Sequence, residues 1–505
     1  MDLTSAITPR AINVKSEFNN TLPDGSIYYE PGNIAFMLFS TALVLLMIPG
    51  VGFFYSGLAR RKSALSLIWL SMMSVAVVSF QWFLWGYSLA FSHTAGRFIG
   101  DLKNFAWIGV LGQPSVASKN VPDLLFAVYQ GMFSCITVSL TLGATAERGR
   151  ILPAVAFMFL FSTLIYDPIA CWTWNPSGWS YRLGGLDFAG GTPVHINSGS
   201  AALAYSLMLG PRLGHGTSSL NYRPHNVTHI VLGTVLMWVG WLGFNGGSAM
   251  GANLRAVVAV ANTILAAGMG GVSWVGLDYR LERKWSVVGF CSGVVAGLVT
   301  ITPGSGYVPP WAAVIYGIVG GAACNYATKL KFVLGVDDAL DIFAEHAVGG
   351  VVGNILTGFF AADYIAALDT TTQIRGGWLN HHWLQPLYQL ADSVAGMSYS
   401  FFVTCIILFF MNMIPGLSLR ASEEAEVLGV DDVELGEFAY DYVELAREVC
   451  VGMDMEEEGT HGCVMGMEEP RGKGEGLGSG LGNLEEGRRG TDVMGEMEGP
   501  GGDKR

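Results

Sequence analysis

The sequence predicts an all-α protein that crosses a membrane many times. Of its 505 residues, 51% are hydrophobic and only 14% are charged. A soluble enzyme of this length would form two or three domains and carry far more surface charge. Apolar stretches of about 20 residues recur along the chain, and this length of helix spans the hydrocarbon core of a bilayer. These observations predict a polytopic membrane protein with eleven transmembrane helices.

The eleven predicted spans follow one another with short connections. They cover residues 33–58, 66–92, 123–143, 151–172, 191–210, 227–250, 256–277, 285–302, 308–328, 340–361 and 395–416. Glycine is frequent, with 67 residues, and many of the glycines lie inside these spans. Small residues allow helix backbones to approach closely in a membrane, so we expect a tightly packed helical bundle.

The cations in the connections predict the orientation of the spans. The first, third, fifth, seventh and ninth connections carry clustered basic residues: Arg60, Arg61, Lys62, Arg148, Arg150, Arg212, Arg223, Arg280, Arg283, Lys284, Lys329 and Lys331. Basic residues are fewer and more widely spaced in the other connections. Because positive loops stay in the cytoplasm, this alternation places the N-terminus outside and the C-terminus inside. An odd number of spans also requires the two ends of the chain to lie on opposite sides of the membrane.

Spans one and six share a faint sequence similarity. Residues 51–54 read VGFF, and residues 242–245 read LGFN. Since five spans separate the two positions, this similarity suggests an inverted repeat of five helices each.

The ends of the chain differ from the spanning part. We predict an extracellular segment (1–32), a transmembrane domain (33–420), a cytoplasmic regulatory segment (421–450) and a disordered tail (451–505). Residues 421–505 hold 23 acidic and 7 basic residues, so the chain's net charge of −13 belongs to this end and does not indicate a cationic substrate. The tail is rich in Gly and Glu and too poor in apolar residues to fold. Asn19 begins a glycosylation sequon on the predicted outer side.

Polar groups inside a membrane are costly, so each one is a candidate functional residue. Among the nine histidines, His195 and His346 lie well inside spans, five helices apart and on opposite approaches. They could meet near the midplane and share a proton, since a neutral imidazole has one donor and one acceptor. The alternative is two unrelated core histidines bonded to backbone carbonyls. A metal site would need further ligands at the same depth, and none is present.

Other residues allow both a structural and a functional interpretation. Asp187 precedes span five and would serve as a helix cap, although in a cation pathway it could also attract the ion. Trp174 could face a cation through its ring, or it could belong to the interfacial aromatic belt. Phe133 and Phe244 could form a hydrophobic constriction or pack in the core. Ser248, one turn beyond Phe244, would offer a hydroxyl. Glu345 points away from His346 around the helix, so we expect it to pair with another helix, where it could modulate the pore.

Four runs of residues resemble the ammonium transporters of the Amt/Mep/Rh family. They are DFAGGTPVHINSG (187–199), GWLGFNGGS (240–248), PGVGFFYSGL (49–58) and YQGMF (129–133). The resemblance covers about residues 30–445, with residues 437–440 matching the cytoplasmic region of the family. Retention of a histidine at position 195 is similar to the fungal twin-histidine branch, which is associated with high-affinity uptake and, in some fungi, with nitrogen sensing.

The resemblance implies a homotrimer with one pore per subunit and an inverted five-plus-five repeat. Carried over by position, it makes Trp174 and Ser248 the outer recruitment site, with Asp187 beneath it and Tyr129 as a further binding residue. It makes Phe133 and Phe244 the gate, His195 and His346 the pore and proton relay, and Trp241 and Glu345 pore-modulating residues. It implies ammonium or ammonia as substrate, a plasma-membrane location, and a cytoplasmic kinase as regulator.

Three further interpretations remain. A neutral-ammonia channel of the Rh type would carry no current, and an ammonium sensor would signal through residues 421–450. An enzyme is not expected, because the chain has no nucleophile with its base, no phosphate loop and no metal cluster. We expect no cofactor and no nucleic-acid partner.

Overall fold

The protein is described by a computed structural model that covers residues 27–217 and 223–440. Asn19 and the predicted tail (451–505) lie outside the described residues, as do residues 441–450 of the predicted regulatory segment. The described residues belong to one compact unit, Met1–Asp441. Helices are the only extended regular structure in this part of the chain, which is joined by turns and isolated bridges such as Gly149 to Arg420.

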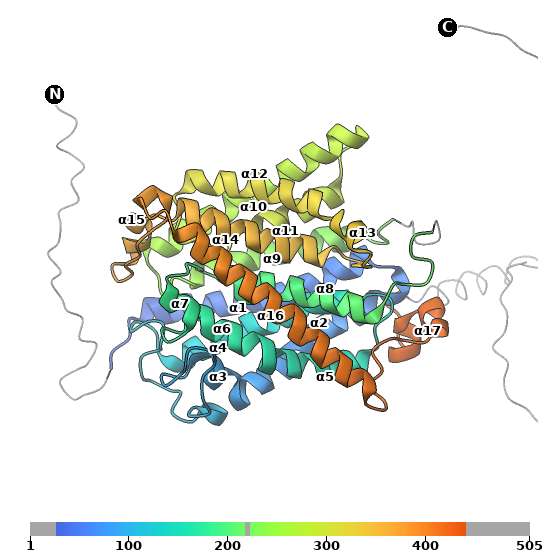
Figure 1. Ribbon diagram of the computed structural model, residues 1–505, viewed down its shortest axis with the longest axis horizontal. Helices are drawn as coiled ribbons and strands as arrows, with labels where there is room; N and C mark the ends of the chain where they lie inside the picture. The colour runs from blue at the N-terminus through green and yellow to red at the C-terminus, as the bar shows by residue number, and fades with distance from the viewer. Residues whose placement is uncertain (1–26, 218–222, 441–505) are drawn as a thin grey trace, which may run out of the picture. The chain divides into compact units, whose positions relative to one another are not determined.

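Long helices form the body of this unit (Figure 1). In chain order the main ones are α1 (Pro31–Leu58), α2 (Ala64–Gln81), α3 (Tyr87–Phe91), α4 (Asp123–Leu142), α5 (Ile151–Phe161), α6 (Asp167–Trp174), α8 (Asn197–Leu209), α9 (Val227–Gly247), α10 (Leu254–Glu282), α11 (Val287–Ile301), α12 (Pro310–Ala327), α14 (Gly349–Phe360) and α16 (Gln385–Met413). Short helices join them: α7 (Trp179–Leu183), α13 (Leu330–Leu334), α15 (Asp363–Ala366) and α17 (Glu423–Leu428).

Every predicted span contains a helix, but the lengths and apolarity differ. Seven helices of the described residues are long and apolar enough to cross a membrane, or eight if the bent pair Phe343–Phe360 and Asp363–Asp369 is one span. The helix α11 is apolar but shorter, and α8 and α12 do not meet these criteria. Most residues of α8 and α11 are buried within the protein, and a helix that faces protein on most sides needs less apolar surface than one that faces lipid.

The largest boundary difference is at the last long helix. We expected a span at 395–416, whereas α16 begins ten residues earlier, at Gln385, with Pro386 in its first turn. Proline fits there because the first N–H groups of a helix have no partner within the helix. Because of this early start, Asp392 lies inside α16, whereas the predicted boundary left it in the connection before the span.

Single π-helical turns occur within or at the start of the long helices at four places. They are η3 (Trp82–Gly86), η6 (Ser162–Tyr166), η7 (Gly191–Ile196) and η9 (Phe343–Val348). The turn η7 begins directly after Gly190, whose φ of +115° favours glycine. Such π-helical turns often occur at functional sites, and η7 and η9 carry the two histidines selected from the sequence.

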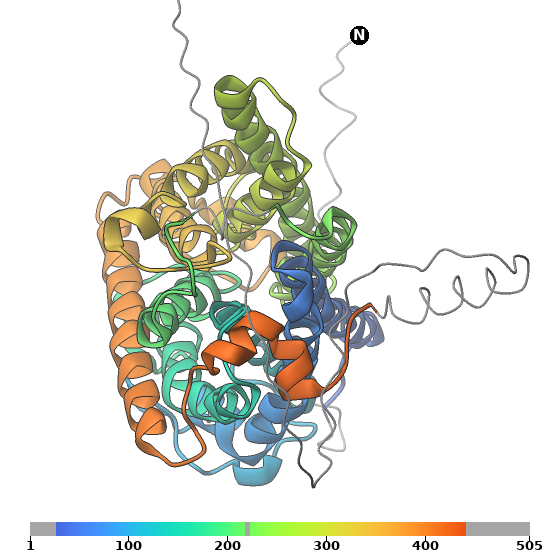
Figure 2. The same cartoon turned by 90° about the vertical axis from the view of Figure 1, so that its right-hand side faces the viewer.

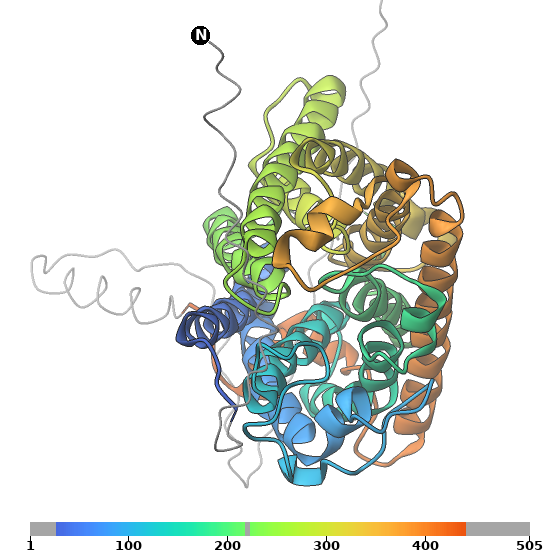
Figure 3. The same cartoon turned by 90° about the vertical axis from the view of Figure 1, so that its left-hand side faces the viewer.

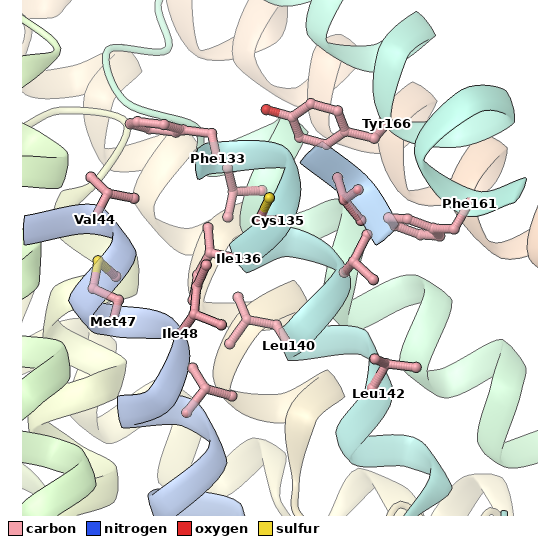
Figure 4. Close-up of a cluster of buried hydrophobic side chains, with 14 of the residues drawn as sticks. Val44, Met47, Ile48, Phe133, Cys135, Ile136, Leu140, Leu142, Phe161 and Tyr166 are labelled. Atoms are coloured by element: carbon pink, nitrogen blue, oxygen red, sulfur yellow. The ribbon is translucent and has the colours of Figure 1, made fainter. Parts of the chain in front are cut away.

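Glycines allow α1 and α9 to pack with their backbones in contact. A Cβ atom added to Gly233 would lie 2.5 Å from the carbonyl oxygen of Gly50 and 2.5 Å from the amide nitrogen of Phe54. Beside this contact, buried side chains of α1, α4 and α5 form the apolar core drawn in Figure 4, where Val44, Met47 and Ile48 of α1 lie near Ile136 and Leu140 of α4. α1 is thus joined to α9 by a close seam in which glycines face the backbone or side chains of the other helix.

The two ends of the helical body have different coverings. At the end facing the viewer in Figure 2, α17 and the turn η12 (Asp431–Leu435) lie across the helix ends. At the opposite end, in Figure 3, the connections 92–122 and 361–384 run over the helices. We call the first end the α17 end and the second the Trp174 end, because α6 finishes there at Trp174.

Candidate functional site

A cavity of about 460 Å³ opens at the Trp174 end. Trp174, Asp187 and Ser248 line it, together with residues from the connections 116–120, 182–188 and 369–375. The indole N–H of Trp174 donates a hydrogen bond to the backbone oxygen of Asp187 at 3.1 Å, which fixes the ring beside the next layer of side chains. An aromatic face, a hydroxyl and a carboxylate in one cavity suit a small cation.

Asp187 caps the helix that follows it, as the structural interpretation of the sequence expected. Its carboxylate accepts hydrogen bonds from the backbone N–H groups of Gly190 and Gly191 at 2.8 Å each and from Thr192 at 2.7 Å. These donors, at the positive end of η7 and α8, stabilise the ionised carboxylate. The side chain is only 7% exposed, so it acts at the floor of the cavity.

Ser248 and Tyr129 meet at the end of α9. Ser248 donates to the backbone oxygen of Phe244 at 2.9 Å, and the Tyr129 hydroxyl donates to the same oxygen at 2.7 Å. The two hydroxyl oxygens are 3.4 Å apart. Tyr129 is fully buried and is not among the residues that line the cavity, so its position supports Ser248 and the end of α9.

Phe133 and Phe244 form the next layer below the cavity. Their rings stack with centroids 4.1 Å apart and an interplanar angle of 27°, and both side chains are fully buried. Phe133 also meets Trp174 edge-on, with ring centroids 5.9 Å apart. The two phenylalanines come from α4 and α9, and together they contact Trp174 of the cavity on one side and His195 on the other.

His195 and His346 lie side by side below the phenylalanines. Their Nδ1 atoms are 3.3 Å apart, and their rings are nearly parallel, with centroids 5.4 Å apart. His195 also stacks on Trp241, at 5.3 Å, and its ring lies 6.1 Å from that of Phe244. The Nε2 atom of His195 is buried and has no hydrogen-bond partner among the described residues, so it offers a free polar atom along the path.

Trp241 and Glu345 lie beside the histidine pair. The Trp241 indole donates to the Thr302 hydroxyl at 3.0 Å, which holds the ring against His195. Glu345 is buried and hydrogen-bonded to Ser292 of α11. It therefore contacts another helix, as expected from its position beside His346, although the partner is a hydroxyl group.

The described residues contain no group of three or more His, Cys, Asp or Glu side chains that could hold a metal ion. A buried pair of imidazoles with one close nitrogen pair can instead pass a proton between them.

Two charged residues of this region were not selected from the sequence. Arg255, at the start of α10, pairs with Asp369 at 2.9 Å and lies over the rings of Phe188 and Tyr307, 4.6 and 4.7 Å from their centroids. Asp392 of α16 contacts Thr192 of η7. Arg255 was interpreted as a cation of the connection before the predicted span 256–277, and Asp392 was missed because the last span was predicted to begin after it.

Comparison with known proteins gives consistent matches over most of the chain. The family model described as the Ammonium Transporter Family matches residues 35–440. Ammonium transporter 1 of Schizosaccharomyces pombe is 59% identical over 449 residues, which are 89% of this chain and 90% of that protein. Ammonium transporter MEP2 of Saccharomyces cerevisiae is 50% identical over 430 residues, 84% of this chain and 86% of that protein. The crystal structure of Saccharomyces cerevisiae Mep2 matches with a TM-score of 0.74 at 50% identity, covering 78% of this chain and 91% of that one.

Proposed function

We propose a mechanism for this protein from one premise: the chain belongs to the ammonium transporter family and transports ammonium across a membrane. The observation that carries the mechanism is the succession of three layers along one path. The cavity with Trp174 comes first, the stacked phenylalanines follow, and the paired histidines lie beyond them.

Ammonium is recruited in the cavity at the Trp174 end. The ion binds over the face of Trp174 and donates a hydrogen bond to the Ser248 hydroxyl oxygen, while Asp187 adds negative charge from the cavity floor. A cation over an indole gains about 0.5–2 kcal/mol, more when water is excluded. Tyr129 supports Ser248 through their shared contact with the Phe244 backbone oxygen.

The phenylalanine layer favours passage of the neutral molecule. Taking a bare ion into an apolar pore costs tens of kcal/mol in the idealised limit, and few contacts are available there to offset this cost. Ammonium therefore gives its proton to a water molecule in the cavity before the gate formed by Phe133 and Phe244. Ammonia passes the gate, and the proton travels separately between His195 and His346, whose nitrogens are 3.3 Å apart. The net movement is one positive charge.

The arrangement in the membrane is part of the proposal. Eleven spans with the N-terminus outside follow from the alternation of basic connections, and they place the Trp174 end outside and the α17 end in the cytoplasm. An inverted five-plus-five repeat is supported by the positions of η7 and η9, which carry the two histidines in the two halves. A homotrimer, a plasma-membrane location and a regulatory kinase acting on the cytoplasmic end are further expectations from the family.

An ammonium pulse applied to liposomes that contain the purified protein tests this mechanism. We expect a current in the wild type that is lost or made non-selective in His195→Ala and His346→Ala. His381→Ala, at an exposed histidine of the Trp174 end, is the matched control and should keep the wild-type current. Uptake without a current would indicate a neutral-ammonia channel. No flux from well-folded protein would favour an ammonium sensor. The relatives described above are named transporters, and no enzymatic activity is proposed.

A further inference from the structure

A second buried carboxylate lies behind the recruitment site. Asp392, on α16, is only 3% exposed. Its Oδ2 atom is hydrogen-bonded to the Thr192 hydroxyl, and its carboxyl group is also bonded to Ser180. Its other oxygen, Oδ1, is buried and has no hydrogen-bond donor among the described residues.

Thr192 connects this carboxylate to Asp187. The Thr192 backbone N–H donates to Asp187 Oδ2 at 2.7 Å, while the hydroxyl of the same residue contacts Asp392. Asn354 donates to the Thr192 hydroxyl oxygen at 2.8 Å and fixes its position. The two carboxyl groups are close enough to interact electrostatically. One residue of the turn that leads to His195 therefore touches both acids.

The two acids have unequal surroundings. Asp187 receives three backbone N–H groups at a helix N-terminus, which stabilise its ionised form. Asp392 receives hydroxyl contacts only, and its unpartnered oxygen makes the ionised form expensive inside the protein. Two neighbouring carboxylates also oppose each other's ionisation. Without a cation nearby, the arrangement with the fewest uncompensated charges has Asp187 ionised and Asp392 protonated.

We propose that Asp392 is a proton-holding residue coupled to the recruitment site, and that it releases its proton when ammonium binds above Asp187. The O–H bond of the Asp392 carboxyl breaks, a water molecule of the outer solution accepts the proton, and the second negative charge then strengthens the hold on the cation. Asp392 acts through Thr192 and Asp187 and does not touch the substrate. The inference rests on the proposed recruitment of ammonium at the Trp174 end.

The groups that face Asp392 limit what else could titrate with it. Asp187 is the ionisable group that interacts with it electrostatically. The polar side chains facing it from α7 and η7, Ser180 and Thr192, do not titrate, and neither does Asn354 of α14, which completes the network. His195 lies three residues beyond Thr192 on η7 and is paired with His346.

Linkage gives the expected pH dependence. Where Asp392 holds its proton, ammonium binding must release it, so the apparent affinity for ammonium rises with pH until Asp392 is already ionised. Asp392→Asn copies the protonated form permanently. Its KM for ammonium should therefore stay high, about fivefold or more above the wild type at neutral pH, and should lose most of its dependence on pH.

The experiment measures ammonium currents of the full-length protein in liposomes at closely spaced pH values from mildly acidic to neutral. The matched control is Asp167→Asn, which changes an equally buried carboxylate of α6 that is bonded to Gln81 and is not among the groups that interact electrostatically with Asp187. We expect a pH-dependent KM in the wild type and in Asp167→Asn, a high and flat KM in Asp392→Asn, and a similar maximal current in all three. A wild-type pH profile of KM in Asp392→Asn would overturn the proposal, and so would equal effects of the two substitutions.

If Asp392→Asn does not fold, a second pair of variants tests the coupling between Asp392 and the recruitment site. Thr192→Ser keeps the bridging hydroxyl and should keep the pH dependence of KM, whereas Thr192→Val removes the hydroxyl and should flatten it. Identical profiles in these two variants would contradict the coupling. Failure of the proposed recruitment itself would look different, because Trp174→Leu and Ser248→Ala would then leave KM at its wild-type value.

Discussion

Phe133 and Phe244 stack face to face across the path, with ring centroids 4.1 Å apart. They come from helices whose sequence positions differ by more than a hundred residues, and neither ring is exposed. In the proposed mechanism ammonia passes between the cavity and the histidines at this pair, so we expect at least one ring to move during transport.

Removing one ring should relax the size selectivity of the pore. We expect Phe244→Ala and Phe133→Ala to raise the rate of methylammonium transport relative to ammonium, because loss of a ring leaves a void that the neighbours fill only partly. The ratio of the two currents, measured in the same liposomes, checks this. It does not depend on how much folded protein is present, and an unchanged ratio in both variants would show that the rings do not form the gate.

The segment after α16 is held to the helix ends by specific caps. Asp431 of η12 accepts hydrogen bonds from the backbone N–H groups of Leu65 at 2.9 Å and Ser66 at 2.8 Å, at the start of α2. Asp431→Ala should weaken this attachment by about 0.5–2 kcal/mol, the usual cost of a lost cap. Limited proteolysis after Met413 should then become faster. Asp432→Ala, at the exposed neighbouring position, is the control and should be cleaved at the wild-type rate.

An ion pair joins two connections at the α17 end. Arg212 contacts both carboxylate oxygens of Asp337, at 2.8 Å each. Burial alone would raise the pKa of Asp337, but the hydrogen bonds and positive charge of Arg212, with Arg148, hold this pKa below its usual value. The pair therefore stabilises the fold fully above the unfolded-state pKa of about 4 and less as pH falls below it.

Asp337→Asn should remove this acid-sensitive contribution. We expect a loss of about 1.5–3 kcal/mol at neutral pH, the usual contribution of hydrogen bonds to a charged group, because Arg212 keeps its ion pair with Glu147. The melting temperature in detergent, followed from neutral to acid pH, should fall in the wild type below about pH 4 and change less in the variant. Parallel curves for the two proteins would contradict the assignment.

Gly233 has no room for a side chain in the contact between α1 and α9. Gly233→Ala would place a methyl group 2.5 Å from backbone atoms of Gly50 and Phe54, so the helices must separate. We expect a loss of about 1–3 kcal/mol, as for other overpacked sites. Size-exclusion chromatography after heating measures it. Gly276→Ala on α10, where nothing lies within 4 Å of the added atom, should retain the wild-type stability.

The sequence predicted the helices better than their details. Each predicted span contains a helix because long apolar runs between basic connections leave few alternatives. The π-helical turns at η7 and η9 could not be predicted, since a widened turn depends on tertiary contacts and leaves no distinct pattern in the residues. The start of α16 was missed because Gln385 and Gln389 look like connection residues, although both are buried and Gln389 holds the backbone of Leu186.

The candidate site shows the same limits. Trp174, Asp187 and Ser248 could be selected one by one as polar or aromatic groups near span ends, and the structure places all three in one cavity. The contact of Asp431 with the start of α2 joins positions 366 residues apart, and no local sequence pattern predicts it. Contacts of this kind depend on how distant segments pack together in the fold. Patterns of neighbouring residues in a single sequence do not predict that packing.

The seam between α1 and α9 has a consequence for the way the protein works. Many transporters expose their site alternately to each side by rocking one half of the protein against the other, and this requires an interface that can slide. Here the backbones of α1 and α9 approach so closely at Gly50 and Gly233 that even a Cβ atom on Gly233 would lie 2.5 Å from the Gly50 carbonyl oxygen. We therefore expect both halves to keep one arrangement through the cycle, so that turnover depends on side-chain movements and proton hops instead of large rearrangements.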